Sequence, residues 1–259
     1  MRLSLFASGS GGNCALVSFG RCRLLLDAGI SARAIRGALA DAGTSPAELD
    51  GILITHEHSD HVSGLSVLLK RDPVPVYAPG TVASHLSWAY PGVEAFLRRV
   101  EPETALELGG ARIVCFPTPH DTPQSVGWRI ETPEGTLAFA TDTGHVTDTM
   151  RRYLRGADAA AIEANHDERM LREGPYPVYL KRRILSENGH LSNADCAVLA
   201  RELADSGVRR IVLAHLSREN NRPEAAREAV LSALAGTQTE LFVAPARERM
   251  DIEVQPCFV

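Results

Sequence analysis

Short runs of apolar residues recur along the chain and predict β-strands. Aliphatic and β-branched residues dominate these runs, and Gly, Pro, Asp or Asn bounds most of them, as is typical of strands separated by turns. The predicted strands are residues 2–8, 14–19, 22–29, 51–56, 74–79, 111–117, 125–132, 136–142, 157–164, 209–217 and 239–244. The longest apolar runs have the length of a strand, so the sequence predicts no membrane-spanning segment.

Segments with helical spacing lie between the strands. Helices are expected at 31–43, 192–207 and 222–236, because each has Ser or Pro near its start and Gly at its end. Hairpin-like strands crowd the N-terminal part, and a second strand-dense stretch covers 111–142. This order predicts an α/β protein with two sheet-rich halves and helices outside them. No linker or repeat divides the chain, so one domain over 1–259 is expected.

Composition and charge limit the binding partners and the cellular compartment expected for this chain. The net charge is -5 and the pI is near 6.0, which argues against a protein that coats nucleic acid through bulk charge. A local basic groove is compatible with this balance. The five cysteines form no Cys-x-x-Cys pair, their number is odd, and nothing resembles a signal peptide. A reducing cytoplasm is therefore the expected location.

A glycine-rich segment, ASGSGGNC, lies between the first two predicted strands. A phosphate-binding P-loop is excluded because no Gly-Lys-Ser/Thr follows and the next segment predicts a strand. A dinucleotide fingerprint is excluded because Cys14 occupies its third glycine position. The segment is interpreted as a turn in which Gly11 and Gly12 are free to take positive φ.

The hexapeptide HEHSDH, which directly follows a predicted strand, carries the most chemical information. Alternate side chains at a strand end share one side, so His56, His58 and Asp60 are expected to converge. If the chain turns into a helix at this point, His61 comes to lie beside Asp60. The residue four positions after His56 is Asp60, so this is not a helical HExxH zinc site. Two adjacent ligand sets predict two metal ions.

Further candidate ligands stand at the ends of other predicted strands. One hexapeptide cannot complete two metal shells of about four ligands each. Asp27, His120, Asp142 and His215 each end such a strand, at the edge where ligands gather in α/β proteins. Taken singly, each is compatible with an ordinary turn residue, and Asp27 with an Asx turn. Taken as a series, they favour a metal site.

The series LLLDAG, THEHSDH, PTPHD, FATDTG and LAHLS resembles the five motifs of the metallo-β-lactamase fold, in the expected order. The resemblance covers nearly the whole chain and implies a four-layer αββα sandwich with a dinuclear site between its sheets. It assigns His56, His58 and His120 to the first metal, Asp60, His61 and His215 to the second, Asp142 as the bridge, and Asp27 as the residue that orients a ligand. Imidazoles suit Zn²⁺, and mixed nitrogen and oxygen shells also accept Mn²⁺.

The chemistry of such a site is hydrolysis by metal-activated water. Two ions that share a carboxylate lie about 3.5–4 Å apart and lower the pKa of a water to about 7. The hydroxide can attack a phosphodiester in line without a serine or cysteine nucleophile. Asp60 and Asp142 are catalytic in this scheme. The fold also hosts lactam, thioester and peroxide chemistry, so the metals alone do not select the substrate.

Tyrosines and cations gather between the fourth and fifth motifs, in the series Tyr176, Tyr179, Lys181, Arg182 and Arg183. Stacking and phosphate-pairing groups of this kind are used on nucleic-acid strands. Lys181 and Arg182 are therefore candidate substrate contacts. A solvated helix face explains the charges nearly as well.

The sequence GHLSN resembles the histidine-bearing loop of the phosphodiesterase branch of the family. The resemblance implies that His190 protonates the leaving oxygen or bonds a phosphate oxygen, with Ser192 and Asn193 as further substrate contacts. The alternative is a helix N-cap at Ser192 with His190 merely nearby. The resemblance also suggests that Ser10 or Asn13 touches a substrate phosphate.

The segments ASGSGGNC, HEHSDH, EANHD, YPVYLKRRILSENGHLSN and LAHLSREN together resemble the single-domain exonucleases of the WalJ (YycJ) type. The resemblance implies a cytoplasmic bacterial enzyme that degrades DNA from 5′ to 3′. A hydrolase of small phosphodiesters, such as cyclic nucleotides, and a ribonuclease of the same fold are the enzymatic alternatives. A non-catalytic protein that binds metal or nucleic acid is the alternative from another class.

Overall fold

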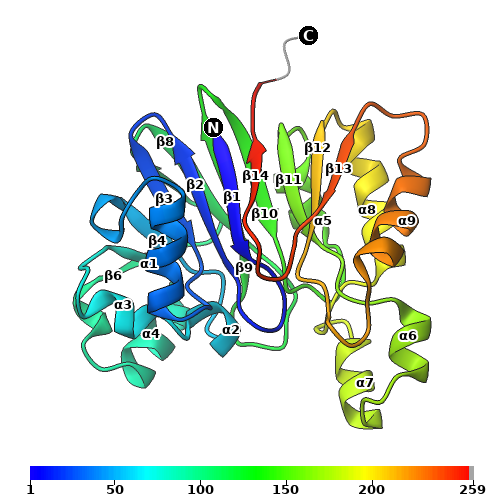
Figure 1. Ribbon diagram of the computed structural model, residues 1–259, viewed down its shortest axis with the longest axis horizontal. Coiled ribbons are helices and arrows are strands. Elements are labelled where there is room, and N and C mark those ends of the chain that lie inside the picture. The colour runs from blue at the N-terminus through cyan, green and yellow to red at the C-terminus, as the bar shows by residue number, and fades with distance from the viewer. Residues whose placement is uncertain (257–259) are drawn as a thin grey trace.

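Two seven-stranded β-sheets face each other in the computed structural model, which describes residues 1–256 (Figure 1). The first sheet has the order β14 (Met250–Glu253), β1 (Arg2–Ala7), β2 (Cys14–Phe19), β3 (Cys22–Leu26), β4 (Gly51–Leu53), β5 (Val76–Pro79) and β6 (Leu97–Val100). The second has the order β13 (Glu240–Val243), β12 (Arg210–Ala214), β11 (Ala159–Glu163), β10 (Gly135–Ala140), β9 (Val126–Thr132), β8 (Ala111–Pro117) and β7 (Ala105–Leu108).

Each sheet joins an antiparallel part to a parallel part. In the first sheet β14, β1, β2 and β3 are antiparallel neighbours, and β3 to β6 run parallel. In the second sheet β7 to β10 are antiparallel, and β10 to β13 run parallel. Apart from β14 and β7, the antiparallel parts coincide with the two strand-dense stretches of the sequence. The parallel parts coincide with the alternation of strands and helices, because parallel neighbours need a crossover connection.

Helices cover the outer face of each sheet (Figure 1). The first sheet carries α1 (Ala32–Asp41), α2 (Ser59–Val62), α3 (Leu65–Leu69) and α4 (Gly80–Ala89). The second carries α5 (Asp148–Leu154), α8 (Asn193–Asp205) and α9 (Pro223–Ala233). Two 3₁₀ turns, η1 (Pro46–Glu48) and η2 (Val93–Ala95), and two short helices, α6 (Glu168–Glu173) and α7 (Val178–Ile184), complete these elements. Figure 1 shows α6 and α7 projecting beyond the sheets. The four layers confirm the predicted αββα sandwich.

Alternation of side chains along single strands builds the layers. On β12, Val212 joins the apolar layer between the sheets, whereas Ile211 and Leu213 pack in the layer that holds α8 and α9. On β2, Val17 faces the other sheet and Leu16 packs in the layer of α1. Because both faces of these strands are buried, they read as continuous apolar runs. Burying one such side chain contributes about 1.5–3 kcal/mol.

Every predicted strand segment contains a strand, and the three predicted helices are α1, α8 and α9. The sequence pattern misses β6, β7 and β14, and also α4 to α7. No helix among residues 1–256 is long and apolar enough to cross a membrane. Cys14, Cys22, Cys115 and Cys196 are buried free thiols, while Cys257 lies outside the described residues.

Candidate metal centre

Three strands of the sandwich are followed by residues in the left-handed backbone region. Asp27 follows β3, Asp142 follows β10 and His215 follows β12, with φ values of 57°, 58° and 57°. Asp and His tolerate this region better than β-branched residues, but each such residue still costs of order 1 kcal/mol. The bend after each strand allows the three side chains to meet in one cluster.

His56, His58 and His120 form the first group of potential ligands. His56 and His58 follow β4, and His120 follows β8 of the opposite sheet. Their ring centroids are separated by 4.7 Å between His56 and His58 and by 5.0 Å for the other two pairs. One nitrogen from each ring lies within 4.8 Å of the other two. The structure thus brings together three histidines from two sheets.

Asp60, His61 and His215 form the second group. The chain enters α2 at Ser59, and this turn places His61 beside Asp60, as the hexapeptide pattern predicts. Oδ2 of Asp60 lies 3.6 Å from Nε2 of His61 and 3.5 Å from Nε2 of His215. The two sheets therefore contribute to this group as well.

Asp142 lies between the two groups. Its Oδ2 is 3.2 Å from Nε2 of His61, and its Oδ1 is 3.5 Å from Nε2 of His215 and 3.8 Å from Nε2 of His120. Burial alone would raise the pKa of the Asp142 carboxyl group, but the charges of His215 and His61 outweigh burial and hold it well below its usual range. The carboxylate is ionised, as a metal ligand must be.

Asp27 holds His61 from the side opposite Asp142. Its Oδ2 accepts a hydrogen bond from Nδ1 of His61 at 2.8 Å, and its Oδ1 accepts one from the backbone N–H of Thr55 at 2.8 Å. This arrangement leaves Nε2 of His61 to face Asp60 and Asp142. A carboxylate partner of this kind fixes ring orientation and raises the basicity of the free nitrogen.

Glu163, at the end of β11, accepts hydrogen bonds from two histidines, as Asp27 does from His61. Its Oε1 accepts hydrogen bonds from Nδ1 of His190 at 2.7 Å and from Nδ1 of His215 at 2.9 Å. Its Oε2 accepts from the backbone N–H groups of Thr143 and Leu191 at 2.8 and 3.2 Å. Burial would raise the pKa of Glu163, but His190 outweighs it and lowers the pKa to about 2.

Sequence reasoning missed Glu163, although a signal was present. The residue lies at the end of the predicted strand 157–164, the same position that selected Asp27, His120, Asp142 and His215 as candidates. In the sequence, the motif EANHD that contains Glu163 contributes only to the family resemblance. A carboxylate at a buried strand end is therefore informative even outside a recognised ligand series.

The unsatisfied atoms of the cluster test whether its residues fit a metal. Within residues 1–256, Nε2 of His56 and Nε2 of His215 are buried without a hydrogen-bond partner. Leaving buried polar atoms without partners is unfavourable, and a cation between the two groups would satisfy them. Imidazole and carboxylate are donors that divalent transition metals accept. The residues present therefore fit a divalent metal centre.

The glycine-rich turn between β1 and β2 lies beside this centre. Gly12 has φ of 135°, as predicted, and a Cβ on it would meet the backbone oxygen of Gly29 at 2.6 Å. Gly9 also has positive φ, at 130°, whereas Gly11 does not, contrary to the prediction. At Gly11 a Cβ would displace the Arg218 guanidinium, which is the end of a flexible side chain.

Asn13 closes the turn onto the metal centre. Its Oδ1 accepts a hydrogen bond from the backbone N–H of Gly9 at 2.9 Å, and its Nδ2 lies 3.0 Å from Nε2 of His61. Asn13 is buried, whereas Ser10 is exposed and lines the adjoining cavity. Of the two predicted phosphate contacts, Ser10 has the more accessible side chain.

A cavity of about 200 Å³ opens onto both groups. Its walls are Ser10, His58, Asp60, His120, Asp121, Asp142, Asn165, Tyr176, Leu180, Arg183, Ile184, Gly189, His190, His215 and Ser217. The segment of α6 and α7 contributes Tyr176 and Arg183, and Arg183 forms an ion pair with Asp121. Sequence reasoning named Tyr176 and Arg183 within the basic segment but did not select them as site residues.

Ser192 and Asn193 have structural partners. The Ser192 hydroxyl accepts from the backbone N–H of Asp195 at 3.1 Å and caps α8, which is the alternative expected for it. The Asn193 amide exchanges two hydrogen bonds of 2.9 Å with the Asn221 amide. Neither residue lines the cavity, so a contact with substrate stays a prediction for both.

Lys181 and Arg182 lie on α7 but do not line the cavity. Nζ of Lys181 donates to the backbone oxygen of Arg172 at 2.7 Å. The next cation, Arg183, is the one that faces the cavity. Substrate contacts of Lys181 and Arg182 stay predictions as well.

Comparisons with known proteins agree with this geometry. The family described as the beta-lactamase superfamily domain matches the sequence of this chain over residues 22–216. Exodeoxyribonuclease YycJ of Bacillus anthracis is 38% identical over 237 residues, which cover 90% of this chain and 89% of that protein. Exodeoxyribonuclease WalJ of Streptococcus pneumoniae is 36% identical over 242 residues, covering 90% and 88%.

A solved structure shows the same fold at lower identity. The metallo-beta-lactamase fold protein YhfI from Bacillus subtilis superposes with a TM-score of 0.73 at 17% identity, covering 96% of this chain and 98% of that one. Its identity is too low to indicate more than the fold. On the family match and the two relatives, this chain belongs to the beta-lactamase superfamily and, within it, to the family that includes YycJ and WalJ.

Proposed function

We propose that this chain is a divalent-metal-dependent phosphodiesterase that acts as a 5′-to-3′ DNA exonuclease. The observation that carries the proposal is the pair of buried ligand groups joined by Asp142, with His190 3.8 Å from the same carboxylate. The two relatives named exodeoxyribonucleases match along most of this chain, which supports DNA as the substrate.

The proposed centre holds two ions, Zn²⁺ or Mn²⁺. Asp142 lies within 3.8 Å of a histidine nitrogen in each group, which supports its role as the bridge. The first ion would be held by His56, His58 and His120, and the second by Asp60, His61 and His215. When bound, such ions act as Lewis acids and lower the pKa of a water to about 7. Asp27 would keep His61 oriented.

His190 is the proposed general acid. Its Nδ1 donates to Glu163, so the other nitrogen, Nε2, is available to the cavity that His190 lines. Burial would lower the pKa of His190, but the Glu163 carboxylate outweighs burial and raises it. A protonated His190 can donate to the leaving oxygen of a phosphodiester. Glu163 acts as a positioning residue in this step.

The α7 helix is the proposed contact surface for the nucleic acid next to the cavity. Tyr179 on this helix is 74% exposed, and it lies near Lys181, Arg182 and Arg183. An exposed aromatic ring among cations suits base stacking and phosphate pairing. Arg183, which lines the cavity, is the cation best placed to approach a reacting phosphate.

A substrate panel tests the proposal. Protein loaded with Zn²⁺ or Mn²⁺ would be assayed on 5′-labelled single-stranded and duplex DNA, on RNA of the same sequence, on a cyclic nucleotide and on bis(p-nitrophenyl) phosphate. We expect early release of the 5′ label from DNA, and no release by Asp142→Ala. Preference for RNA would favour the ribonuclease alternative, and turnover without length dependence would favour the small-phosphodiester alternative. Metal-loaded protein that is inert on every substrate would leave the non-catalytic alternative.

A cytoplasmic location belongs to the same proposal. The free state of four buried cysteines is compatible with a reducing compartment. Fractionation of the producing cell tests it, and recovery in the extracellular or membrane fraction would contradict it.

A further inference from the structure

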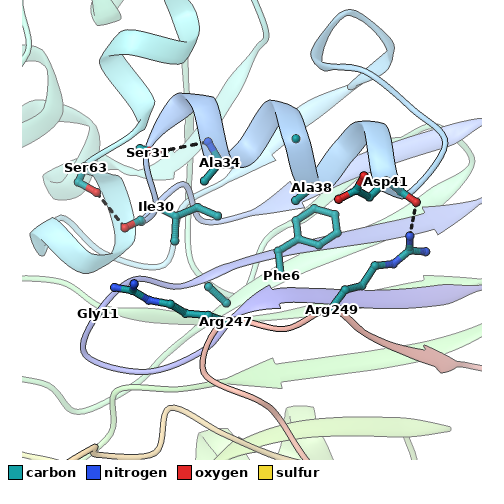
Figure 2. A pocket seen from close by; sticks show the side chains of 13 residues that line it. Phe6, Gly11, Ile30, Ser31, Ala34, Ala38, Asp41, Ser63, Arg247 and Arg249 are labelled. Atoms are coloured by element: carbon teal, nitrogen blue, oxygen red, sulfur yellow. Dashed lines mark hydrogen bonds between the residues drawn. The ribbon is translucent and has the colours of Figure 1, made fainter.

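A second cavity adjoins the glycine-rich turn, at Gly11 (Figure 2). It has a volume of about 620 Å³, against about 200 Å³ for the cavity at the metal centre. Ser10 lines the metal-centre cavity and the next residue, Gly11, lines the larger one. We call the larger space, bounded by α1, the end of β1 and the segment between β13 and β14, the α1 cleft. The two spaces therefore adjoin the same turn.

One wall of the α1 cleft is a helix face without large side chains. Ala34, Gly37 and Ala38 of α1 line it, and a Cβ on Gly37 would meet no atom within 4 Å. Figure 2 shows the Phe6 ring below this face and Ile30 toward the helix start. Glycine inside a helix costs about 1 kcal/mol relative to alanine, so helix stability does not account for Gly37. The Phe6 ring itself is buried beneath the helix, so the open space lies along the small side chains of α1.

Uncommitted cations border the α1 cleft. Arg247 extends toward the turn that holds Gly11 (Figure 2). The Arg218 guanidinium lies against Gly11 at the shared turn, outside the lining of the cleft. Among the contacts of residues 1–256, neither arginine has an ion pair or a side-chain hydrogen bond. Arg249, by contrast, is paired with Asp251 and bonds the backbone oxygen of Asp41. Two free guanidinium groups thus flank the turn that the two cavities share.

The volume of the metal-centre cavity limits what it can hold. Pockets that bury a small ligand usually measure about 300–1,000 Å³, and this cavity is smaller. A polymer that reacts there must therefore continue over the surrounding surface. The α1 cleft is adjacent, falls within that range of volumes and has free cations at the shared turn.

We propose that the α1 cleft holds the single-stranded nucleic acid that continues from the reacting phosphate. Backbone phosphates would pair with Arg247 in the cleft and with Arg218 at the shared turn, and a base would lie against the small face formed by Ala34, Gly37 and Ala38. Asp41 lines the far end beside Arg249, and its charge confines the strand to the half nearest Gly11. The inference rests on the proposed function because it assigns the path of that substrate.

Filling the α1 cleft tests the inference. Binding of a fluorescent 12-nucleotide single-stranded DNA would be measured by anisotropy in the presence of a chelator, so that no hydrolysis occurs. We expect Gly37→Trp to weaken binding at least tenfold. The matched control is Ala40→Trp, on the same helix but exposed and outside the cleft, and it should bind like the wild type. Thermal melting verifies that both variants are folded.

Charge removal tests the inference independently. Arg247→Ala should reduce the slope of log Kd against log salt by about 0.7, the contribution of one phosphate contact on a single strand. Arg21→Ala is the control, because Arg21 is an exposed arginine in the β2–β3 turn and lies outside the cleft. Loss of slope in both variants would indicate bulk charge and overturn the assignment.

The outcomes separate this inference from the proposed function. If the wild type degrades DNA while Gly37→Trp binds it with unchanged affinity and Arg247→Ala with unchanged salt slope, the cleft assignment is wrong and the exonuclease proposal stands. If the wild type hydrolyses no phosphodiester but Gly37→Trp weakens DNA binding and Arg247→Ala lowers the salt slope, the proposed function fails and the cleft assignment stands. A wild type that does not bind the oligonucleotide overturns the cleft assignment directly.

Discussion

Nδ1 of His61 lies 2.8 Å from Oδ2 of Asp27, and both side chains are fully enclosed by the fold. Thr55 donates to the same carboxylate through its backbone N–H and its hydroxyl group. These bonds orient the His61 ring before any metal binds, so its Nε2 already faces the shared carboxylate of Asp142. Residues that are not ligands themselves, Asp27 and Thr55, therefore help to fix the geometry of the metal centre.

Substitution of Asp27 should weaken metal binding. Asp27→Asn preserves the shape and the tolerance of positive φ but removes the charge that fixes His61, and partners of this kind are worth about 10–100-fold in metal affinity. Competition with a chromogenic zinc chelator measures the change. Asp50→Asn is the control, because Asp50 accepts a hydrogen bond from the backbone of Arg23 in an exposed position. Equal zinc affinity in both variants would contradict the role of Asp27.

Loss of His190 should affect turnover more than metal content. His190→Ala removes the proposed proton donor, and a positioned acid contributes about 10²–10⁴-fold to the rate. We expect kcat to fall by that factor, while elemental analysis finds the same metal per chain as in the wild type. Glu163→Gln, which removes the carboxylate that positions His190, should also lower kcat. A parallel loss of metal and activity in His190→Ala would show that His190 is a ligand instead.

Ser192→Ala distinguishes a helix cap from a substrate contact. The Ser192 hydroxyl accepts the N–H of Asp195, and loss of an N-cap costs about 1 kcal/mol. We expect a lower denaturation midpoint in urea and an unchanged KM for DNA. A higher KM with unchanged stability would instead restore Ser192 as a substrate contact.

Two glycines beside α1 should respond in opposite ways to alanine. A Cβ on Gly37 enters open space, and alanine is favoured over glycine inside a helix by about 1 kcal/mol, so Gly37→Ala should stabilise the fold. A Cβ on Gly29 would collide with the backbone oxygen of Asp60, so Gly29→Ala should destabilise it. Chemical denaturation measures both, and a stabilised Gly29→Ala would refute the close packing of these segments.

The buried thiols should resist alkylation at neutral pH. Burial raises the pKa of Cys22 to about 12 and that of Cys115 to about 12, and it also raises the pKa values of Cys14 and Cys196. Because the thiolate is the reactive form, its fraction at pH 8 is small and grows only as the pH approaches those values. Mass spectrometry of the iodoacetamide-treated native protein should find no label on these four cysteines, and label on all of them after unfolding.

The positions of ligands at strand ends could be predicted from sequence because two local signals coincide there. A buried strand is recognised in the sequence by its apolar run, and the polar ligand directly after it ends that run. Glu163 gives the same local signal, but its importance comes from His190, which is 27 positions away. Only the folded chain brings a carboxylate and an imidazole at that separation into contact.

The cations of α7 show why the sequence alone could not identify which of them faces the cavity. Lys181, Arg182 and Arg183 are consecutive, and successive helix positions point in different directions, so at most part of the series faces one cavity. Leu180 and Ile184 line the cavity with Arg183, but α7 also exposes Val178. Because apolar residues lie on both faces of α7, the sequence pattern does not indicate which face is turned toward the cavity.

Edge strands are weak signals for a related reason. Within the described sheets, β14 and β6 stand at opposite edges of the first sheet. Of the four residues of β14, only Ile252 is buried. A strand that is exposed along one side needs few apolar residues, and its sequence then resembles a loop.

The left-handed residues at three strand ends have a further consequence for evolution and engineering. At Asp27, Asp142 and His215 a glycine would relax the backbone, and at Asp142 it would also remove a buried charge. Glycine at position 27 would also leave His61 and Thr55 without their buried carboxylate partner, which costs more than the backbone strain. The hydrogen bonds that orient the centre therefore also hold its strained backbone, so thermostable variants of this fold should be sought elsewhere in the chain.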